Sequence, residues 1–333
     1  MAYITLNKNN FFNNLDIITN QTKSKDKVAI VLKDNAYGHG LLEIALLAQK
    51  YGIKKAVVRS EIEAKKIEKF FEYILVLADY PSRANEKMRY TINDINSIQK
   101  FTKGTKVELK VDTGMHRNGI DMSELREAFL KIKEAGLNLE AIFMHHRSAD
   151  ELSSEWFWQN SNFKKIKYQA KELATEFGFE PLRFHSANSA SILRTSDFDE
   201  DMARVGIAAY GCLDANEKLL PVLSLHADKI SSRNVKKGQK IGYGGTKTVQ
   251  KDCTVSNYNF GYADGFFRTL SNNFTTPDAK ELVGRISMDN SSFISEDEKL
   301  LIFNDARVVA PLVGTISYEI LTSLKADLKR EIV

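Results

Sequence analysis

The chain has 333 residues, enough for one large or two medium-sized domains with a real core. Its 47 Lys and Arg residues and 43 Asp and Glu residues leave a net charge of +4, and because these charges are interspersed they argue against a nucleic-acid-binding protein. The polar N-terminal stretch lacks the pattern of a signal peptide, and no apolar run approaches the ~18 residues of a membrane span. The two cysteines, Cys212 and Cys253, have no metal-type spacing and are expected to be reduced thiols, so we expect a cytoplasmic globular protein.

Short apolar runs alternate with helical patterns through about residue 210. The predicted strands are 28–33, 55–59, 73–78, 88–92, 106–111, 139–145, 182–187 and 203–209. The predicted helices are 41–51, 60–71, 121–135 and 153–177. This alternation predicts an α/β protein whose residues 1–215 form an eightfold β/α (TIM-type) barrel. An open doubly wound sheet is the alternative, but the GxGxxG fingerprint that would follow its first strand is missing.

The pattern changes after about Leu220. Apolar and polar residues alternate, glycine turns recur at short intervals, and helical periodicity is nearly absent until about Ser317. We therefore expect residues 216–333 to form a C-terminal, mainly-β domain. The first ten or so residues of the chain are candidates for packing with this domain.

The stretch VAIVLKDNAYGHG, residues 28–40, contains the first candidate for a catalytic residue. Its apolar beginning is typical of a strand buried on both faces, and the run ends in Lys33. A lysine amine that is partly desolvated at the end of such a strand is a usable nucleophile or base. The alternative is an ordinary lysine whose long side chain reaches out to solvent.

Polar side chains also follow the other predicted strands, at the ends where a β/α barrel carries its chemistry. They are Lys33 and Tyr37; Lys110, Asp112 and Arg117; His145 and His146; His185, Asn188 and Ser189; and Arg204 and Gly206. Singly, each has an ordinary interpretation: Asp112 as a turn residue, His185 as a core histidine, Arg204 as an ion-pair partner. Together they predict a cationic pocket that takes an anionic ligand.

The residue types narrow the chemistry further. The Ser189 hydroxyl and the Gly206–Ile207 backbone are possible donors to a phosphate. The six histidines show no HxxxH or HExxH arrangement, so we expect no metal, and Ser189 lacks the GxSxG context of a hydrolase. A phosphate-bearing cofactor held by a Schiff-base lysine fits these residues better.

LKDNAYGHG resembles the cofactor-lysine signature of the alanine racemases, which use pyridoxal 5′-phosphate (PLP). Similar blocks continue in the family's order and spacing along nearly the whole chain: KVDTGMHRNGI, MHHRSADE, HSANSA, MARVGIAAYG, IGYGGT, GYADGFFR, GRISMDN and ISYEIL. The resemblance implies a fold-type III PLP barrel followed by a β-domain. It also implies a homodimer in which each active site takes residues from both chains.

The resemblance assigns roles position by position. Lys33 would hold PLP as an internal aldimine and act as the base on one face, and Tyr243 of the partner chain would be the base on the other face. The remaining cofactor-binding residues would be Tyr37, His145, Asn188, Ser189, Arg204, Gly206, Ile207 and Tyr318. Among them Arg204 would face the pyridine nitrogen, and His145 would link it to Tyr243 through hydrogen bonds.

For the substrate, the resemblance implies that Arg117 and the backbone of the partner's Met288 bind the carboxylate. Tyr262 of the partner would narrow the entrance, and Lys110 matches a position that is carbamylated in some members. Three residues depart from the family pattern: Asp34, Arg59 and Lys247. None of the three is a position with an assigned catalytic role.

The resulting expectation is a PLP-dependent isomerase that interconverts L-alanine and D-alanine by a two-base mechanism and supplies D-alanine for peptidoglycan. The nearest alternative is a broader racemase of the same fold, acting on serine, lysine or other amino acids. A fold-related decarboxylase is disfavoured because MARVGIA lacks both a glycine-rich phosphate loop and a carboxylate for the pyridine nitrogen. A single-barrel cofactor-homeostasis protein is disfavoured by the added domain that carries Tyr243 and Met288.

Overall fold

The structure, a computed structural model, describes residues 2–179, 181–214 and 216–333. These residues form two compact units. One consists of residues 15–34 and 44–209 and is called the barrel unit below; the other consists of the described residues up to Asn14, residues 35–43 and residues from Tyr210 onward, and is called the second unit. The expected domain boundary at residue 215 falls on a residue outside the described ones.

Eight parallel strands form the sheet of the barrel unit. They are β2 (Val28–Val31), β3 (Lys55–Val58), β4 (Tyr73–Val76), β5 (Met88–Ile92), β6 (Lys106–Lys110), β7 (Asn138–Phe143), β8 (Arg183–His185) and β9 (Ala203–Val205). Neighbouring strands pair in the order β8-β7-β6-β5-β4-β3-β2-β9, all in parallel. The predicted eightfold β/α barrel is confirmed, in a nearly closed form.

The apolar runs explain why these segments are strands. All four residues of β2 and of β4 are buried, as expected for strands that face the barrel interior on one side and helices on the other. Most observed strands end before the predicted ones, because the last residues of each run leave the sheet and form the loops at its carboxyl edge. Those loops carry the candidate site.

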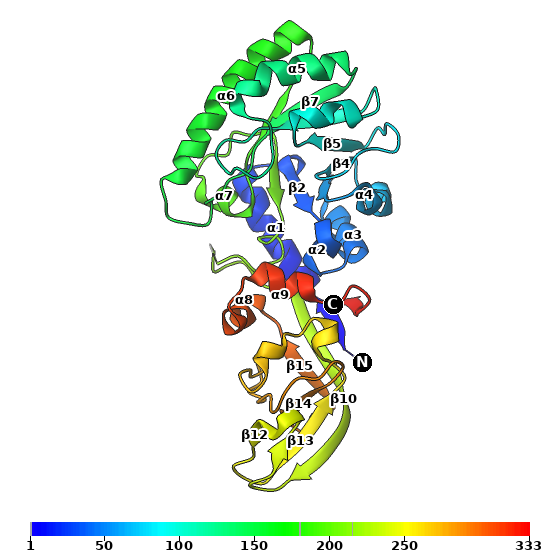
Figure 1. Ribbon diagram of the computed structural model, residues 1–333, viewed down its shortest axis with the longest axis vertical. Coiled ribbons are helices and arrows are strands. Elements are labelled where there is room, and N and C mark those ends of the chain that lie inside the picture. Colours follow the sequence, from blue (N-terminus) through cyan, green and yellow to red (C-terminus); the bar gives the residue numbers. More distant parts are fainter. Residues whose placement is uncertain (1, 180, 215) are drawn as a thin grey trace. The chain divides into compact units, whose positions relative to one another are not determined.

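Helices surround the strands of the barrel unit (Figure 1). They are α3 (Leu41–Tyr51), α4 (Glu61–Ile67), α5 (Leu125–Glu134), α6 (Glu155–Phe177) and α7 (Ser189–Arg194). The start of α4 is fixed by a capping box between Ser60 and Glu63, and α6 ends at Gly178, whose φ of 76° suits a left-handed cap. The four helices predicted from the sequence are all present.

The sequence analysis did not predict α1 (Lys8–Thr22). Its segment contains five asparagines, which are weak helix formers. The signal that was available is the spacing of Phe11, Leu15 and Ile18, all fully buried. Asn14 lies on the same stripe and bonds both the N–H and the C=O of Leu220, at 2.8 Å each, so this asparagine is a tertiary anchor inside a helix.

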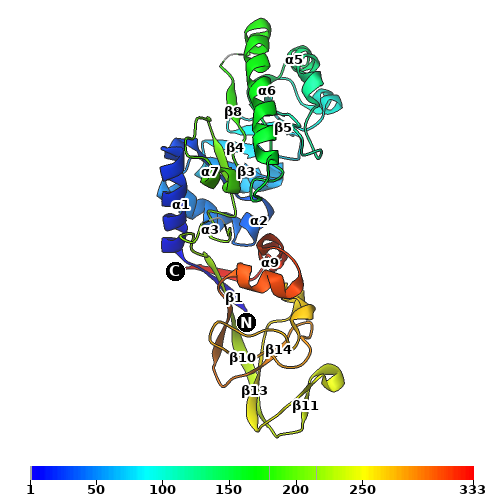
Figure 2. The same ribbon diagram turned by 90° about the vertical axis from the view of Figure 1, so that its left-hand side faces the viewer.

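The second unit is built around a six-stranded sheet. Its strands are β1 (Tyr3–Leu6), β10 (Leu223–Val235), β13 (Cys253–Tyr258), β14 (Ser291–Ile294), β15 (Lys299–Phe303) and β16 (Lys329–Ile332). β10 is central and pairs antiparallel with β15 and with β1 and β13, both of which are labelled beside it in Figure 2. A small separate sheet pairs β11 (Lys240–Ile241) with β12 (Lys247–Thr248). The predicted mainly-β character is confirmed.

Helices in the second unit are short. They are α8 (Ala306–Val309) and α9 (Ser317–Ser323), the latter beginning where helical periodicity reappears in the sequence. Short 3-10 helices occur along the whole chain at Lys25–Lys27, Glu68–Phe70, Ile95–Lys100, Met122–Glu124, Tyr243–Gly245, Tyr262–Asp264, Arg268–Leu270 and Ala310–Val313. Among the residues described, no helix combines the length and apolarity needed to cross a membrane.

Candidate active site

Lys33 lies at the start of α2 (Lys33–Tyr37), one residue beyond the buried strand β2. This helical turn is left-handed: residues 34–37 have φ between 52° and 56°. Such a conformation costs roughly 1–2 kcal/mol per residue for amino acids other than glycine. The backbone leaves the strand through a strained turn whose first residue is the candidate catalytic lysine, and strain of this kind collects at functional sites.

Glu63 holds the beginning of this turn. Its carboxylate accepts the N–H of Asp34 and the N–H of Arg59, each at 2.8 Å. The side chains of Asp34 and Arg59 form an ion pair at 3.2 Å. These two residues depart from the family pattern, and the structure shows that they contact each other. The third departure, Lys247, pairs with Glu281.

Lys33 belongs to a group of cations at the carboxyl edge of the barrel sheet. Lys110, only 8% exposed, lies at its centre. Burial, and then the positive charges of Arg117 and Arg204, lower the pKa of Lys110 to about 8; Lys33 adds to this effect and Asp112 opposes it. The half-buried Lys33 amine is therefore close enough to act on Lys110 electrostatically.

His145 is surrounded by the same cations. Burial lowers its pKa well below the usual value, and Arg204, Lys110 and Arg117 lower it further. The imidazole is consequently neutral near pH 7, and it can donate or accept a hydrogen bond without adding charge. These cations form a cluster within the barrel unit, and the charge of the cluster suits a ligand with phosphate and carboxylate groups.

Asp112 behaves as the turn residue that was considered for it. Its Oδ1 accepts the backbone N–H groups of Gly114, Met115 and His116 at 2.8, 2.9 and 3.1 Å. This bonding pattern shapes the loop that leads to Arg117. Asp112 therefore contributes to the site through the backbone.

Arg204 is the buried middle residue of β9. Its guanidinium donates to the carbonyl oxygens of Met144 at 2.8 Å and Ser186 at 3.3 Å, and to Nδ1 of His185. Burial lowers the pKa of Arg204 to about 10, so it remains a cation near neutrality. Within the described part of the chain no hydrogen bond joins Arg204 to His145, and the expected link from His145 to Tyr243 stays a prediction.

His185 is the core histidine that was considered as an alternative. The ring is fully buried, it stacks on Phe143, and both nitrogens have partners: Arg204 at Nδ1 and Glu108 at Nε2, the latter at 2.9 Å. Glu108 was missed by the sequence analysis. Its signal was a charged residue inside an apolar strand, between Val107 and Leu109.

Ser189 and Gly206 lie together in the barrel unit. The Ser189 hydroxyl oxygen accepts the N–H of Gly206 at 3.0 Å and that of Ala208 at 3.3 Å. This oxygen is an acceptor in both bonds, so its hydrogen is left to donate to an anion. Asn188 caps α7 by accepting the N–H groups of Ala190 and Ser191. Ile207 is buried beside Gly206. The donor chemistry of this group fits a phosphate.

Two further candidates, Tyr37 and Tyr318, lie in the second unit. Their rings are 5.7 Å apart, centroid to centroid, and Tyr37 also contacts Tyr210 at 5.3 Å. The loop that carries Tyr37 packs closely on α9, because a Cβ at Gly38 would lie 1.9 Å from the carbonyl oxygen of Leu321. The two phenols are thus held together by the fold of this unit.

Tyr243, Tyr262 and Met288 lie on three turns of the second unit. Backbone hydrogen bonds join two of these turns, from the N–H of Tyr262 to Ser287 and from the N–H of Ala263 to Met288, at 3.1 and 3.0 Å. Tyr243 begins the 3-10 turn that follows Gly242. The exposed fractions of Tyr243, Tyr262 and Met288 are 66%, 42% and 54%. Large side chains with this exposure are available to a partner.

Comparison with known proteins gives consistent matches over the whole chain. Residues 6–214 match the family model "Alanine racemase, N-terminal domain", and residues 222–332 match "Alanine racemase, C-terminal domain". The alanine racemase of a Nitratiruptor species is 44% identical over 335 residues, covering 99% of each chain. That of Campylobacter curvus is 41% identical over 337 residues and the full length of both.

Solved structures of alanine racemases are also similar to this chain along its whole length. The alanine racemase from Bacillus anthracis with bound L-Ala-P is similar with a TM-score of 0.86 and 28% identity, covering 100% of this chain and 95% of that one. The alanine racemase from Bartonella henselae with covalently bound pyridoxal phosphate gives a TM-score of 0.82 and 25% identity, covering 100% and 99%. With both domains matched in order and relatives above 40% identity along its length, the chain belongs to the alanine racemase family.

Proposed function

We propose that this protein is a PLP-dependent isomerase that interconverts L-alanine and D-alanine. The observation that carries the proposal is the group of the cations Lys33, Arg117 and Arg204 around Lys110 at the carboxyl edge of the barrel sheet, in a chain that belongs to the alanine racemase family. The product D-alanine would serve peptidoglycan synthesis. We also propose a cytoplasmic location, supported by two free cysteines.

In this proposal Lys33 would hold the cofactor covalently. The positively charged or hydrogen-bonding groups that hold its ring and phosphate are Tyr37, His145, Asn188, Ser189, Arg204, Gly206, Ile207 and Tyr318. Bound PLP makes the Cα proton of an attached amino acid acidic by delocalising the electron pair that the proton leaves behind.

The residues of the chain then move the proton. Inversion at Cα needs one group that removes a proton from one face and a second that delivers a proton to the other face. The Lys33 amine serves one face and the phenol of Tyr243 from a partner subunit serves the other. Arg117 and the partner's Met288 backbone hold the substrate carboxylate, and Tyr262 limits the room for its side chain. The small methyl group of alanine fits this limit.

A homodimer with shared sites is part of the proposal. It is supported by the exposure of Tyr243, Tyr262 and Met288, which leaves these side chains free to reach another chain. The proposed domain boundary lies at residues 215–216.

One experiment tests the reaction and its substrate. The purified holoenzyme is incubated with single L-amino acids, and the products are separated by chiral chromatography. We expect rapid D-alanine formation that disappears in Lys33→Ala and in Tyr243→Phe. Comparable rates with serine and lysine would favour the broader racemase instead, and full activity in Tyr243→Phe would contradict the two-base scheme.

Mixing the two inactive variants tests the sharing of sites. A hybrid dimer of Lys33→Ala and Tyr243→Phe chains contains one site with both groups intact, so random reassociation should restore about a quarter of the wild-type activity. Co-expression of the two chains with different affinity tags provides the hybrids. If each site is built from one chain, no activity returns.

We also propose that Lys110 is carbamylated. Its pKa of about 8 leaves roughly a tenth of the amine neutral at pH 7, far more than for an ordinary lysine. The neutral amine adds CO₂, and the carbamate formed gives Arg117 an anionic neighbour. Carbon NMR with ¹³C-bicarbonate should show a carbamate signal that is absent from Lys110→Ala.

A further inference from the structure

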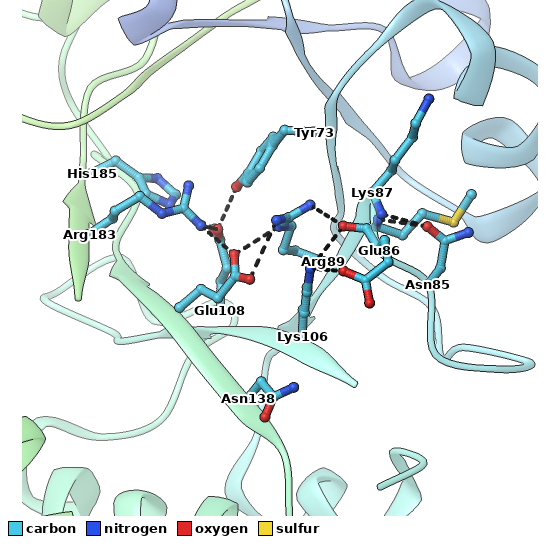
Figure 3. Close-up of polar contacts among 12 residues, drawn as sticks. Tyr73, Asn85, Glu86, Lys87, Arg89, Lys106, Glu108, Asn138, Arg183 and His185 are labelled. Atoms are coloured by element: carbon cyan, nitrogen blue, oxygen red, sulfur yellow. Dashed lines mark hydrogen bonds and ion pairs between the residues drawn. The ribbon is translucent and has the colours of Figure 1, made fainter. Parts of the chain in front are cut away.

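A buried carboxylate lies one layer below the proposed site. Glu108 is on β6, two residues before Lys110, and its side chain is fully buried. It accepts hydrogen bonds from the Tyr73 hydroxyl at 2.5 Å, from Arg183 at 3.0 Å and from Nε2 of His185 at 2.9 Å, and Figure 3 shows these groups converging on it. The cation and the hydrogen-bond donors around it make the charge on Glu108 stable inside the barrel.

The other nitrogen of His185 contacts Arg204, so the two ends of one imidazole join the proposed cofactor contact to the buried carboxylate. A guanidinium group only donates hydrogen bonds, so Nδ1 of His185 must accept and carries no proton. The ring proton is therefore on Nε2, where the Glu108 carboxylate accepts it. Both neighbours of His185 demand the same tautomer.

The electrostatics of the pair agree with this assignment. Burial lowers the pKa of His185, so the ring is neutral near pH 7 even beside a carboxylate. Burial alone would raise the pKa of Glu108, but the hydrogen bond from His185, the charge of Arg183 and the Tyr73 hydroxyl more than offset this and lower it. The pair is an anion beside a neutral imidazole, in which only the position of one proton remains to be fixed.

We propose that Glu108 is a positioning residue that fixes His185 as its Nε2–H tautomer and thereby orients the Arg204 guanidinium. The opposite tautomer would set an N–H of His185 against an N–H of Arg204 and push the guanidinium away. The inference rests on the proposed function, in which Arg204 contacts the cofactor ring. Phe143, which packs against both Arg204 and His185, leaves the two groups little freedom to rearrange.

Replacement of Glu108 by glutamine should reverse the tautomer. One carboxylate oxygen, Oε1, accepts from both Tyr73 and Arg183, and the other, Oε2, faces His185. In Glu108→Gln the amide oxygen has to take the position with two donors, which places the NH₂ group against Nε2 of His185. That nitrogen must then accept, so the ring proton moves to Nδ1, opposite Arg204.

The same cluster provides a matched control. Glu140 accepts from Arg183 at 2.9 Å and from Arg89 at 2.8 Å, and the structure gives it no bond to His185 among the residues it describes. Glu140→Gln removes one negative charge from the network while it leaves the His185–Glu108 contact in place. A role of the cluster in stability alone predicts similar behaviour for the two glutamine variants.

Nitrogen NMR of ¹⁵N-histidine-labelled protein, with and without PLP, reads the tautomer directly, and His185→Asn assigns the signal. We expect a proton on Nε2 in the wild type and in Glu140→Gln, and on Nδ1 in Glu108→Gln. In Glu108→Gln the kcat for alanine should fall about 10–100-fold, as for other groups that orient a contacting residue, with little change in KM. The absorption band of bound PLP should shift in Glu108→Gln and not in Glu140→Gln.

Two results would overturn the inference. One is a wild-type His185 that carries its proton on Nδ1, or on both nitrogens, near pH 7. This measurement uses the wild-type protein alone, so it decides the question even if Glu108→Gln does not fold. The other is a folded Glu108→Gln protein with an unchanged tautomer and unchanged kcat. The NMR signal does not depend on the substrate, so a failure of the alanine assignment would leave it interpretable.

Discussion

The two units differ in how they hold their share of the proposed site. In the barrel unit, Lys110, Ser189 and Arg204 are buried, and their surroundings shift the pKa values of Lys110 and Arg204. In the second unit, Tyr243 and Met288 are more than half exposed, and backbone hydrogen bonds tie the turn of Met288 to the turn of Tyr262. The barrel residues are therefore preorganised within one chain, whereas the exposed residues support folding little and, in the proposed homodimer, would act in the site of a partner chain.

The sharpest way to separate the two kinds of residue is to compare Tyr243→Phe with Arg204→Met. Tyr243→Phe should lose about 10²–10⁴-fold in kcat, the usual range for a general acid or base, with an unchanged Tm. Arg204→Met should lose activity and also about 2–5 kcal/mol of stability, because buried carbonyl oxygens lose their donors. Chiral chromatography and thermal unfolding measure both. A lowered Tm in Tyr243→Phe would show that Tyr243 also supports the fold, and would contradict the difference between the two units.

Acid should weaken the barrel unit through its buried histidines. Burial lowers the pKa of His146 from 6.5 to about 4, so this group favours the fold above pH 6.5, and that contribution is lost as the pH falls from 6.5 to 4. The full effect is about 3 kcal/mol. Chemical unfolding of wild type and His146→Gln at pH 7 and pH 4 tests it. The variant should lose less stability over this interval, and equal losses would contradict the assignment.

A smaller effect is expected at Gly261, which supports the exposed side chains. A Cβ at this position would lie 2.2 Å from the carbonyl oxygen of Met288, so Gly261→Ala should force the two turns apart at a cost of about 1–3 kcal/mol and reduce kcat. Gly238→Ala is the control, because its φ of +86° is unfavourable for alanine, unlike that of Gly261, but no atom lies near its Cβ. Both variants should lower Tm, and only Gly261→Ala should lower kcat. Equal kcat values would mean that the turns adapt.

The barrel could be predicted from the sequence because parallel strands buried on both faces appear as continuous apolar runs. Several polar residues of the candidate site could be identified because they directly follow these apolar runs. The left-handed turn after Lys33 was not predicted: Asn35 and Gly38 indicate a turn, but its handedness over four residues other than glycine has no local signal. The helix α1 was obscured by asparagines whose buried member serves a tertiary contact.

The role of Glu108 could not be predicted from the sequence. A glutamate between apolar neighbours suggests the solvent face of a strand, and its partners are remote: Tyr73 is 35 positions away and Arg183 is 75. Only the folded sheet, in which β4, β6 and β8 are separated by one strand each, brings these residues together. The ordinary interpretations of Asp112 and His185 were both correct, and in the structure these ordinary roles shape the surroundings of Arg117 and Arg204.

The left-handed turn also limits how this protein can evolve. Four consecutive positions with positive φ admit glycine, asparagine and aspartate readily but almost exclude β-branched residues. An insertion or deletion there would change which residue follows β2 and would move the lysine out of its place. Variation should accordingly accumulate in surface loops, while few substitutions should be tolerated at positions 33–37.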